Sequence, residues 1–291
     1  MGLGLGCQQK PTVMSGSAGV LSKNSVLTHR IQKQFSSEKK IVLLDARQKF
    51  DFEAFHLPGS INFNLDEVQV RNARGAYVLN PDLFKISRRL ANYGVDPSSQ
   101  VILLGYGPSG RGEEAAMAFY LRMLGLDQVF AVAIDNFRAH PFPQSPLQSL
   151  PLWKPRALEI FVDKEKLEVL LKDVPRFSPN SKARAAALQS DFPLESARGL
   201  LIADELVEPD WFKSSKRGEN VGFWSTQVLN PIEFVDKQGL WTSENVRSRL
   251  NFSSFQIVVI QSRDIEKSLA LGYVAHLAGA PRIVLLRHEQ K

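Results

Sequence analysis

Short apolar runs alternate along the chain with longer stretches in which apolar residues recur every three or four positions. The runs have the length of buried strands, and the longer stretches have the spacing of amphipathic helices. This alternation is typical of an α/β fold with a parallel sheet. In the first half it predicts strands at Ile41–Leu44, Val101–Leu104 and Gln128–Ala133, and helices at Pro81–Tyr93 and Glu113–Gly125.

The second half of the chain follows the same pattern after a proline-rich stretch. Five prolines lie within His140–Pro155, which is the composition of a linker. Beyond it the pattern predicts strands at Gly199–Ala203, Gln256–Ile260 and Ile283–Leu286, and helices at Lys164–Lys172, Thr242–Leu250 and Lys267–Ala278.

Two segments of the chain resemble each other. Val101–Gly125 and Ile257–Gly279 each contain a strand, a short loop and a helix that ends in glycine, and a further strand follows each of them. A chain of 291 residues is long enough for two domains of about 130 residues. We therefore expect a leader or tether at 1–25, one domain at 26–146, a linker at 147–158 and a second domain at 159–291.

Composition excludes several classes of function. No apolar run approaches the ~20 residues that a membrane-spanning helix needs. The net charge is +6, but no basic cluster is interleaved with aromatic residues as nucleic-acid binding requires. The single cysteine, Cys7, excludes intramolecular disulfides and a thiolate metal cage, and the histidines lack metal-ligand spacing. We expect neither a metal nor another cofactor.

A specific motif follows the first expected strand. That strand ends in Asp45-Ala46-Arg47, and His56-Leu57-Pro58-Gly59-Ser60-Ile61 comes about ten residues later. The combination D-x-R and H-[IL]-P-G-[AS]-[IV] resembles the rhodanese (sulfurtransferase) family. With the two similar segments, the chain resembles the tandem form of that family, the thiosulfate and 3-mercaptopyruvate sulfurtransferases, over roughly residues 27 to 291.

The resemblance implies a fold and a set of structural residues. The implied fold is α/β, with two rhodanese-like domains that each contain a small parallel sheet flanked by helices on both faces. It also implies that Asp45 and Arg47 brace a loop rather than react. His56, Pro58 and Gly59 complete the structural motif.

The resemblance also implies where catalysis would occur. The family carries sulfur on one cysteine thiolate, in a loop that follows a later strand. Aligning the second half puts Ser262 or Gln261 at that position, and the first half has Gly105 or Tyr106 there. None of them is a cysteine. The segment Gln261–Lys267 contains no glycine but does contain two acids, so we expect a degenerate member without its nucleophile.

We therefore expect a catalytically inactive protein with a binding or scaffold role, whose partner is an unknown protein or a small anion. One alternative is a sulfurtransferase that acts by a non-standard route. A second is an anion-binding module that uses the glycine-rich loop. That loop also has the G-x-G-x-x-G form of a dinucleotide-binding turn, but the motifs before it argue against that function. The candidate anion-binding residues are Gly105, Tyr106, Gly107, Ser109, Gly110 and Arg111.

The first residues read MGLGLGCQQK. Leu-Gly-Leu-Gly-Cys resembles the end of a bacterial lipoprotein signal, which would make Cys7 a lipidated residue and a membrane tether at the cell envelope. That interpretation requires a start codon upstream of Met1. The alternative is a tail with an incidental cysteine on a cytoplasmic protein.

Overall fold

The structure is a computed structural model. It describes residues 41–137 except 74 and 76, and then 149–156, 161–162 and 199–203. It also describes 224–286 except 238, 251, 253–256 and 263. Cys7, the expected helix at Lys164–Lys172 and residues 147–148 and 157–158 of the expected linker lie outside the described residues.

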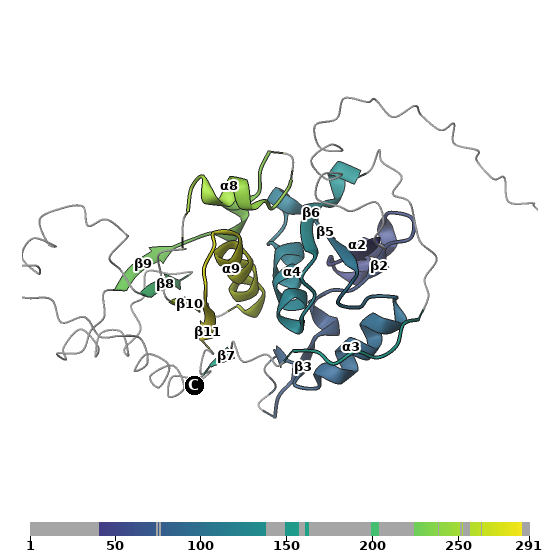
Figure 1. Cartoon of the computed structure of the whole chain (residues 1–291). Helices are drawn as coiled ribbons and strands as arrows, with labels where there is room; N and C mark the ends of the chain where they lie inside the picture. Colours follow the sequence, from purple (N-terminus) through teal and green to yellow (C-terminus); the bar gives the residue numbers. More distant parts are fainter. Residues whose placement is uncertain are drawn as a thin grey trace, which may run out of the picture.

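The first sheet has four parallel strands in the order β2-β1-β5-β6 (Figure 1). Side chains alternate between its two faces, as the two-residue period of a strand requires. Leu44 and Leu103 belong to one buried cluster, and Leu43 and Ile102 belong to another. The strands are β1 (Ile41–Asp45), β2 (Ile61–Asn62), β5 (Gln100–Gly105) and β6 (Val129–Ala133).

The second sheet has five parallel strands in the order β7-β11-β10-β8-β9. The order β9-β8-β10-β11 matches the order β2-β1-β5-β6 of the first sheet. The strands are β7 (Phe161–Val162), β8 (Gly199–Ala203), β9 (Trp224–Val228), β10 (Ile257–Gln261) and β11 (Ile283–Leu286). These parallel sheets and their helices confirm the expected α/β class.

Four helices lie close to their expected bounds: α3 (Leu83–Asn92), α4 (Glu113–Leu124), α8 (Ser243–Arg247) and α9 (Ile265–Leu277). Another helix, α2 (Lys49–Ala54), was not expected from the sequence. A small antiparallel hairpin, β3 (Gln69–Arg71) and β4 (Tyr77–Leu79), was not expected from the sequence. None of the described helices is both long and apolar enough to cross a membrane.

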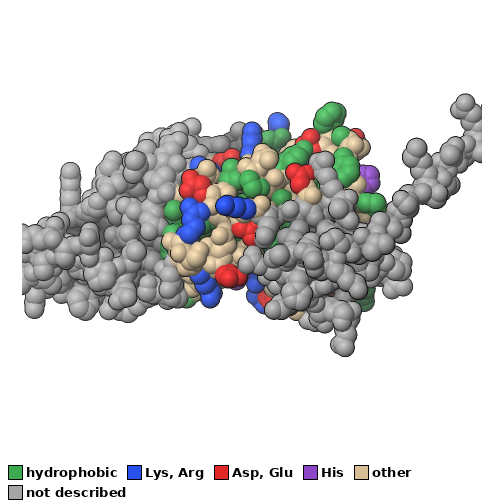
Figure 2. Space-filling view, turned by 90° about the horizontal axis from the view of Figure 1, so that it is seen from above, with side chains coloured by type: hydrophobic (Ala, Val, Ile, Leu, Met, Phe, Trp, Pro, Cys, Tyr) green, Lys and Arg blue, Asp and Glu red, His purple; other side chains and the backbone are tan. Residues whose placement is uncertain are grey.

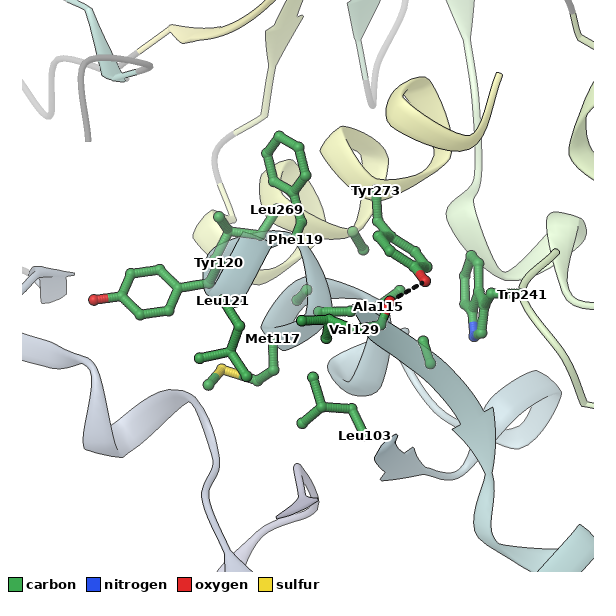
Figure 3. Packing of buried hydrophobic residues seen from close by; sticks show 14 of the residues in the cluster. Leu103, Ala115, Met117, Phe119, Tyr120, Leu121, Val129, Trp241, Leu269 and Tyr273 are labelled. Carbon is green, nitrogen blue, oxygen red and sulfur yellow. Dashed lines mark hydrogen bonds between the residues drawn. The ribbon is translucent and has the colours of Figure 1, made fainter. Parts of the chain in front are cut away.

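Helices α4 and α9 lie side by side and join the two sheets through a shared core (Figures 1 and 3). Phe119 of α4 and Leu269 of α9 are both buried in this contact. The Tyr273 hydroxyl of α9 donates a 3.4 Å hydrogen bond to the Val129 carbonyl of β6. The loops that precede α4 and α9 are the two positions where the resemblance places catalysis.

Candidate functional site

The loop after β5 is filled by a carboxylate of the chain itself. Residues 106–112 connect β5 to α4, and Glu113 begins that helix. The Tyr106 amide donates to Glu113 Oε1 at 2.9 Å, and the Arg111 amide donates to Oε2 at 2.9 Å. A Cβ on Gly110 would lie 2.7 Å from each of these oxygens. Glycine at 110 therefore leaves room for the Glu113 carboxylate, which takes two donors that an external anion would otherwise use.

The backbone of this loop also depends on glycine at two turns. Gly107 has φ 58° and Gly112 has φ 88°, a left-handed conformation that glycine adopts without a steric cost. A Cβ on Gly107 would lie 2.5 Å from the Ala133 Cβ of β6. The glycines that suggested an anion site thus shape a tight turn against the first sheet.

The loop after β10 is shorter and is also occupied internally. Residues 262–264 alone join β10 to α9. Asp264 Oδ1 accepts hydrogen bonds from the Glu266 amide at 2.8 Å and from the Lys267 amide at 3.4 Å. The Asp264 amide in turn donates to Ser262 Oγ at 3.1 Å. The first-turn donors of α9 are therefore used by its own N-cap, as is usual for aspartate at this position.

The strand ends show where the four residues expected at the nucleophile position lie. β5 ends at Gly105 and β10 ends at Gln261, so these two residues occupy equivalent positions in the two sheets. Tyr106 and Ser262 follow them in the sequence. Ser262 is buried, and among the described residues the Gln261 Oε1 atom is buried without a hydrogen-bond partner. None of the four side chains can carry a persulfide.

The acidic groups at the starts of α4 and α9 act on each other. Burial, together with the charges of Glu113 and Asp264, raises the pKa of Glu266 to about 7. Arg111 opposes this shift, and Asp66 adds to it. The acidic side chains between the two loops therefore disfavour the binding of an external anion there. Within the described residues, no group of three His, Cys, Asp or Glu side chains could hold a metal ion.

Asp45 and Arg47 form a buried ion pair behind the first loop. Arg47 Nε lies 3.0 Å from Asp45 Oδ1, and Arg47 Nη2 lies 2.7 Å from Oδ2. Arg47 also donates to the Phe55 carbonyl at 2.6 Å, and its guanidinium lies 5.3 Å from the centre of the Tyr106 ring. The pair therefore touches both the end of α2 and the loop after β5.

The remaining motif residues lie in a turn after α2. His56 Nδ1 lies 3.0 Å from the Phe52 carbonyl, and the two rings are stacked at 4.4 Å. Gly59 has φ 76°, which explains glycine at this position of the motif. Pro58 precedes it, and the Ser60 amide donates to the Leu57 carbonyl at 3.0 Å.

Sequence reasoning missed one acidic residue of this region, Glu114. Glu114 is fully buried, and its Oε1 accepts a 2.8 Å hydrogen bond from the Trp241 indole. Burial, together with the charge of Glu113, raises the pKa of Glu114 to about 8, although the hydrogen bond from Trp241 acts in the opposite direction. Two acids at a helix start are usually exposed and favoured by the helix dipole, so the sequence held no signal for a buried one.

Comparisons with known proteins agree with this fold. Residues 28–133 match the family model described as the rhodanese-like domain. The chain resembles the crystal structure of YnjE, with 14% identity, a TM-score of 0.50, and coverage of 89% of this chain and 62% of that one. It also resembles Tum1 from Saccharomyces cerevisiae, with 14% identity, a TM-score of 0.50, and coverage of 89% and 90%.

A third similar structure is wild-type EanB, with 13% identity, a TM-score of 0.50, and coverage of 89% of this chain and 63% of that one. The chain thus spans less than two thirds of YnjE and of EanB. No curated protein sequence matches significantly. At these identities the structural likeness shows the fold alone, whereas the family match identifies the first half. The expectation of a rhodanese-like domain is confirmed for the first half of the chain, where residues 28–133 match that family.

Proposed function

We propose that this protein is a non-catalytic rhodanese-like protein that acts by binding a partner. The observation that carries the proposal is the internal occupation of both candidate loops. Glu113 takes the amides of the loop after β5, and Asp264 takes the first-turn amides of α9. A sulfurtransferase loop needs these donors for the thiolate and the persulfide.

The residues at the strand ends support the same proposal. Gly105 and Gln261 stand where β5 and β10 end; Gly105 has no side chain, and the amide of Gln261 is not a nucleophile. The chain has one cysteine, Cys7, which lies outside the described residues. Sulfur transfer depends on a thiolate, so a non-standard route through this chain would have to use Cys7.

Exposed aromatic side chains beside the first loop supply surface for a partner. Phe50 of α2 is 80% exposed, and Phe55 at its end is 41% exposed. Arg47 links this end of α2 to the loop. Figure 2 shows hydrophobic side chains gathered with charged ones at the end of the molecule that carries the first sheet. Large exposed aromatic groups are a common feature of protein-binding surfaces.

A sulfurtransferase assay on the full chain tests the proposal. Thiosulfate and 3-mercaptopyruvate are supplied in turn with cyanide as acceptor, and thiocyanate is measured. We expect no thiocyanate above the protein-free rate. Saturable formation of thiocyanate would overturn the proposal.

The matched control is Cys7→Ser, which removes the only thiol. If the full chain were active and this variant were not, the alternative of a non-standard route through Cys7 would hold. If both were active, the reaction would not depend on cysteine.

A further inference from the structure

A short segment of the second half completes the first sheet. Residues 239–241, here termed the edge segment, run antiparallel to β6. The Ala133 amide donates to the Gly239 carbonyl at 2.8 Å, and the Trp241 amide donates to the Ala131 carbonyl at 3.4 Å. Leu240 pairs with Val132 and packs in the apolar cluster of the first sheet. The edge segment thus joins the two halves through both backbone and core.

One buried carboxyl group lies beneath this junction. Glu114 on α4 has no solvent exposure, and Trp241 Nε1 of the edge segment donates to its Oε1 at 2.8 Å. Its Oε2 atom has no hydrogen-bond partner. A Cβ on Gly105 would lie 2.0 Å from Oε2, so glycine at the end of β5 makes room for the carboxyl. The indole is therefore the one side chain, among those described, that binds this group.

The charged groups around Glu114 do not neutralise it. Strands β5 and β6 contain no titratable side chain. On α4 the neighbour Glu113 is also acidic, and on α9 the phenol of Tyr273 faces Glu114. Among the described residues, no basic side chain forms an ion pair with Glu114.

The remaining charges belong to neighbouring groups. Arg111 in the loop after β5 and Glu266 on α9 act on each other and on Glu113 rather than on Glu114. In the stretch before the edge segment, Asp236 accepts a hydrogen bond from the Leu240 amide. An ionised Glu114 would therefore be a buried charge without a counter-charge, which is costly.

We propose that the hydrogen bond between Glu114 and Trp241 is a proton-controlled latch that holds the edge segment on the first sheet. When Glu114 carries its proton, the neutral carboxyl tolerates burial and its Oε1 accepts the indole N–H. When the proton leaves, the carboxylate gains hydration only if the edge segment separates from β6. This inference does not depend on whether the protein is catalytic.

The direction of the pH effect follows from the two states of Glu114. Burial raises its pKa from 4.5 to about 8 in the closed state. In an open, solvated state the group has its ordinary value, so closing takes up a proton. The closed state is favoured at low pH, and the opening constant rises about tenfold for each pH unit between the two pKa values. Above the closed-state pKa the effect levels off.

Hydrogen exchange on the full chain tests the latch between pH 6 and pH 9. The reporter is the Ala133 amide, whose hydrogen bond to the Gly239 carbonyl breaks when the edge segment leaves β6. In the wild type we expect its protection factor to fall about tenfold per pH unit up to about pH 8. In Glu114→Gln, which cannot ionise, we expect no dependence on pH. The same fall in that variant, or no fall in the wild type, would overturn the proposal.

Two controls and one further variant separate the latch from other effects. The Val258 amide, bonded to Arg282 in the second sheet, should keep its protection, and an equal fall there would show global unfolding and overturn the latch. Glu266→Gln should keep the pH dependence at Ala133, because Glu266 belongs to a different contact.

Trp241→Phe keeps the packing but removes the N–H, so we expect about tenfold less protection at pH 6, as for one lost hydrogen bond. Unchanged protection in Trp241→Phe would also contradict the latch, and this test remains if Glu114→Gln fails to fold.

Discussion

The ring of Phe119 lies against the backbone of Gly272 where α4 and α9 meet. A Cβ on Gly272 would come within 2.2 Å of Phe119 Cε1. The two helices therefore approach closely because one of them has no side chain at the contact. Since these helices join the two sheets, the contact between Phe119 and Gly272 contributes directly to the connection between the halves.

Gly272→Ala should destabilise the protein. Overpacking a core costs about 1–3 kcal/mol, and alanine regains at most about 1 kcal/mol of helix propensity over glycine. We expect a net loss of about 1–2 kcal/mol in the free energy of unfolding, measured by urea denaturation. Adding Phe119→Leu should recover part of the loss because the smaller side chain makes room. A Gly272→Ala variant as stable as the wild type would show that the ring moves freely.

Arg47→Ala should lower stability rather than remove a reaction. The substitution leaves Asp45 buried without its partner, and breaking a buried ion pair costs about 3–5 kcal/mol. Thermal unfolding measures the effect. Arg47→Lys is the matched control: it keeps the charge but loses the two-point contact, so its loss should be smaller. An unchanged melting temperature in Arg47→Ala would mean that the pair does not brace the loop.

Glu113→Ala should turn the loop after β5 into an anion site. The substitution frees the Tyr106 and Arg111 amides and removes a negative charge. Titration with sulfate, followed by the NMR shifts of these amides, should show a Kd on the order of 1 mM, or about −4 kcal/mol. The wild type and the exposed-surface control Glu53→Gln should not bind. Equal binding by the wild type would favour the anion-binding module instead.

His276→Gln should reduce the loss of stability in acid. Burial, together with the charges of Arg122 and Arg247, lowers the pKa of His276 from 6.5 to about 4. The unfolded state therefore binds a proton before the native state does, so stability falls as the pH drops from about 6.5 to about 4. Urea titrations across this range should show a shallower fall in the variant. An identical fall in both proteins would show that His276 is solvated.

Cys7 is tested on the native protein by mass spectrometry. The lipoprotein-like sequence predicts an N-terminus at Cys7 that bears diacylglycerol. Such a lipid and a short tether would hold the protein at a membrane surface. An unmodified Cys7 within an intact N-terminal segment would contradict this and favour the tail.

Periodicity in the sequence was sufficient for the main elements. The strands Gly199–Ala203 and Ile283–Leu286 have the bounds that were expected, and α4 ends one residue before Gly125 as its glycine cap indicates. The short strands β2 and β3 were missed because two or three residues carry no periodic signal. The strand β9, which begins at Trp224 and pairs with β8, was also not expected.

The chain's own pattern also determined what the candidate loops lack, since no cysteine stands at either strand end. What fills those loops was decided only by the tertiary structure. Glu113 reaches back to Tyr106 because the intervening glycines turn the loop onto it. Glu114 meets Trp241, which is 127 residues away, only after α4 packs on α9 and the edge segment pairs with β6. A buried carboxyl depends on the packing of distant segments, and no local sequence pattern records that packing.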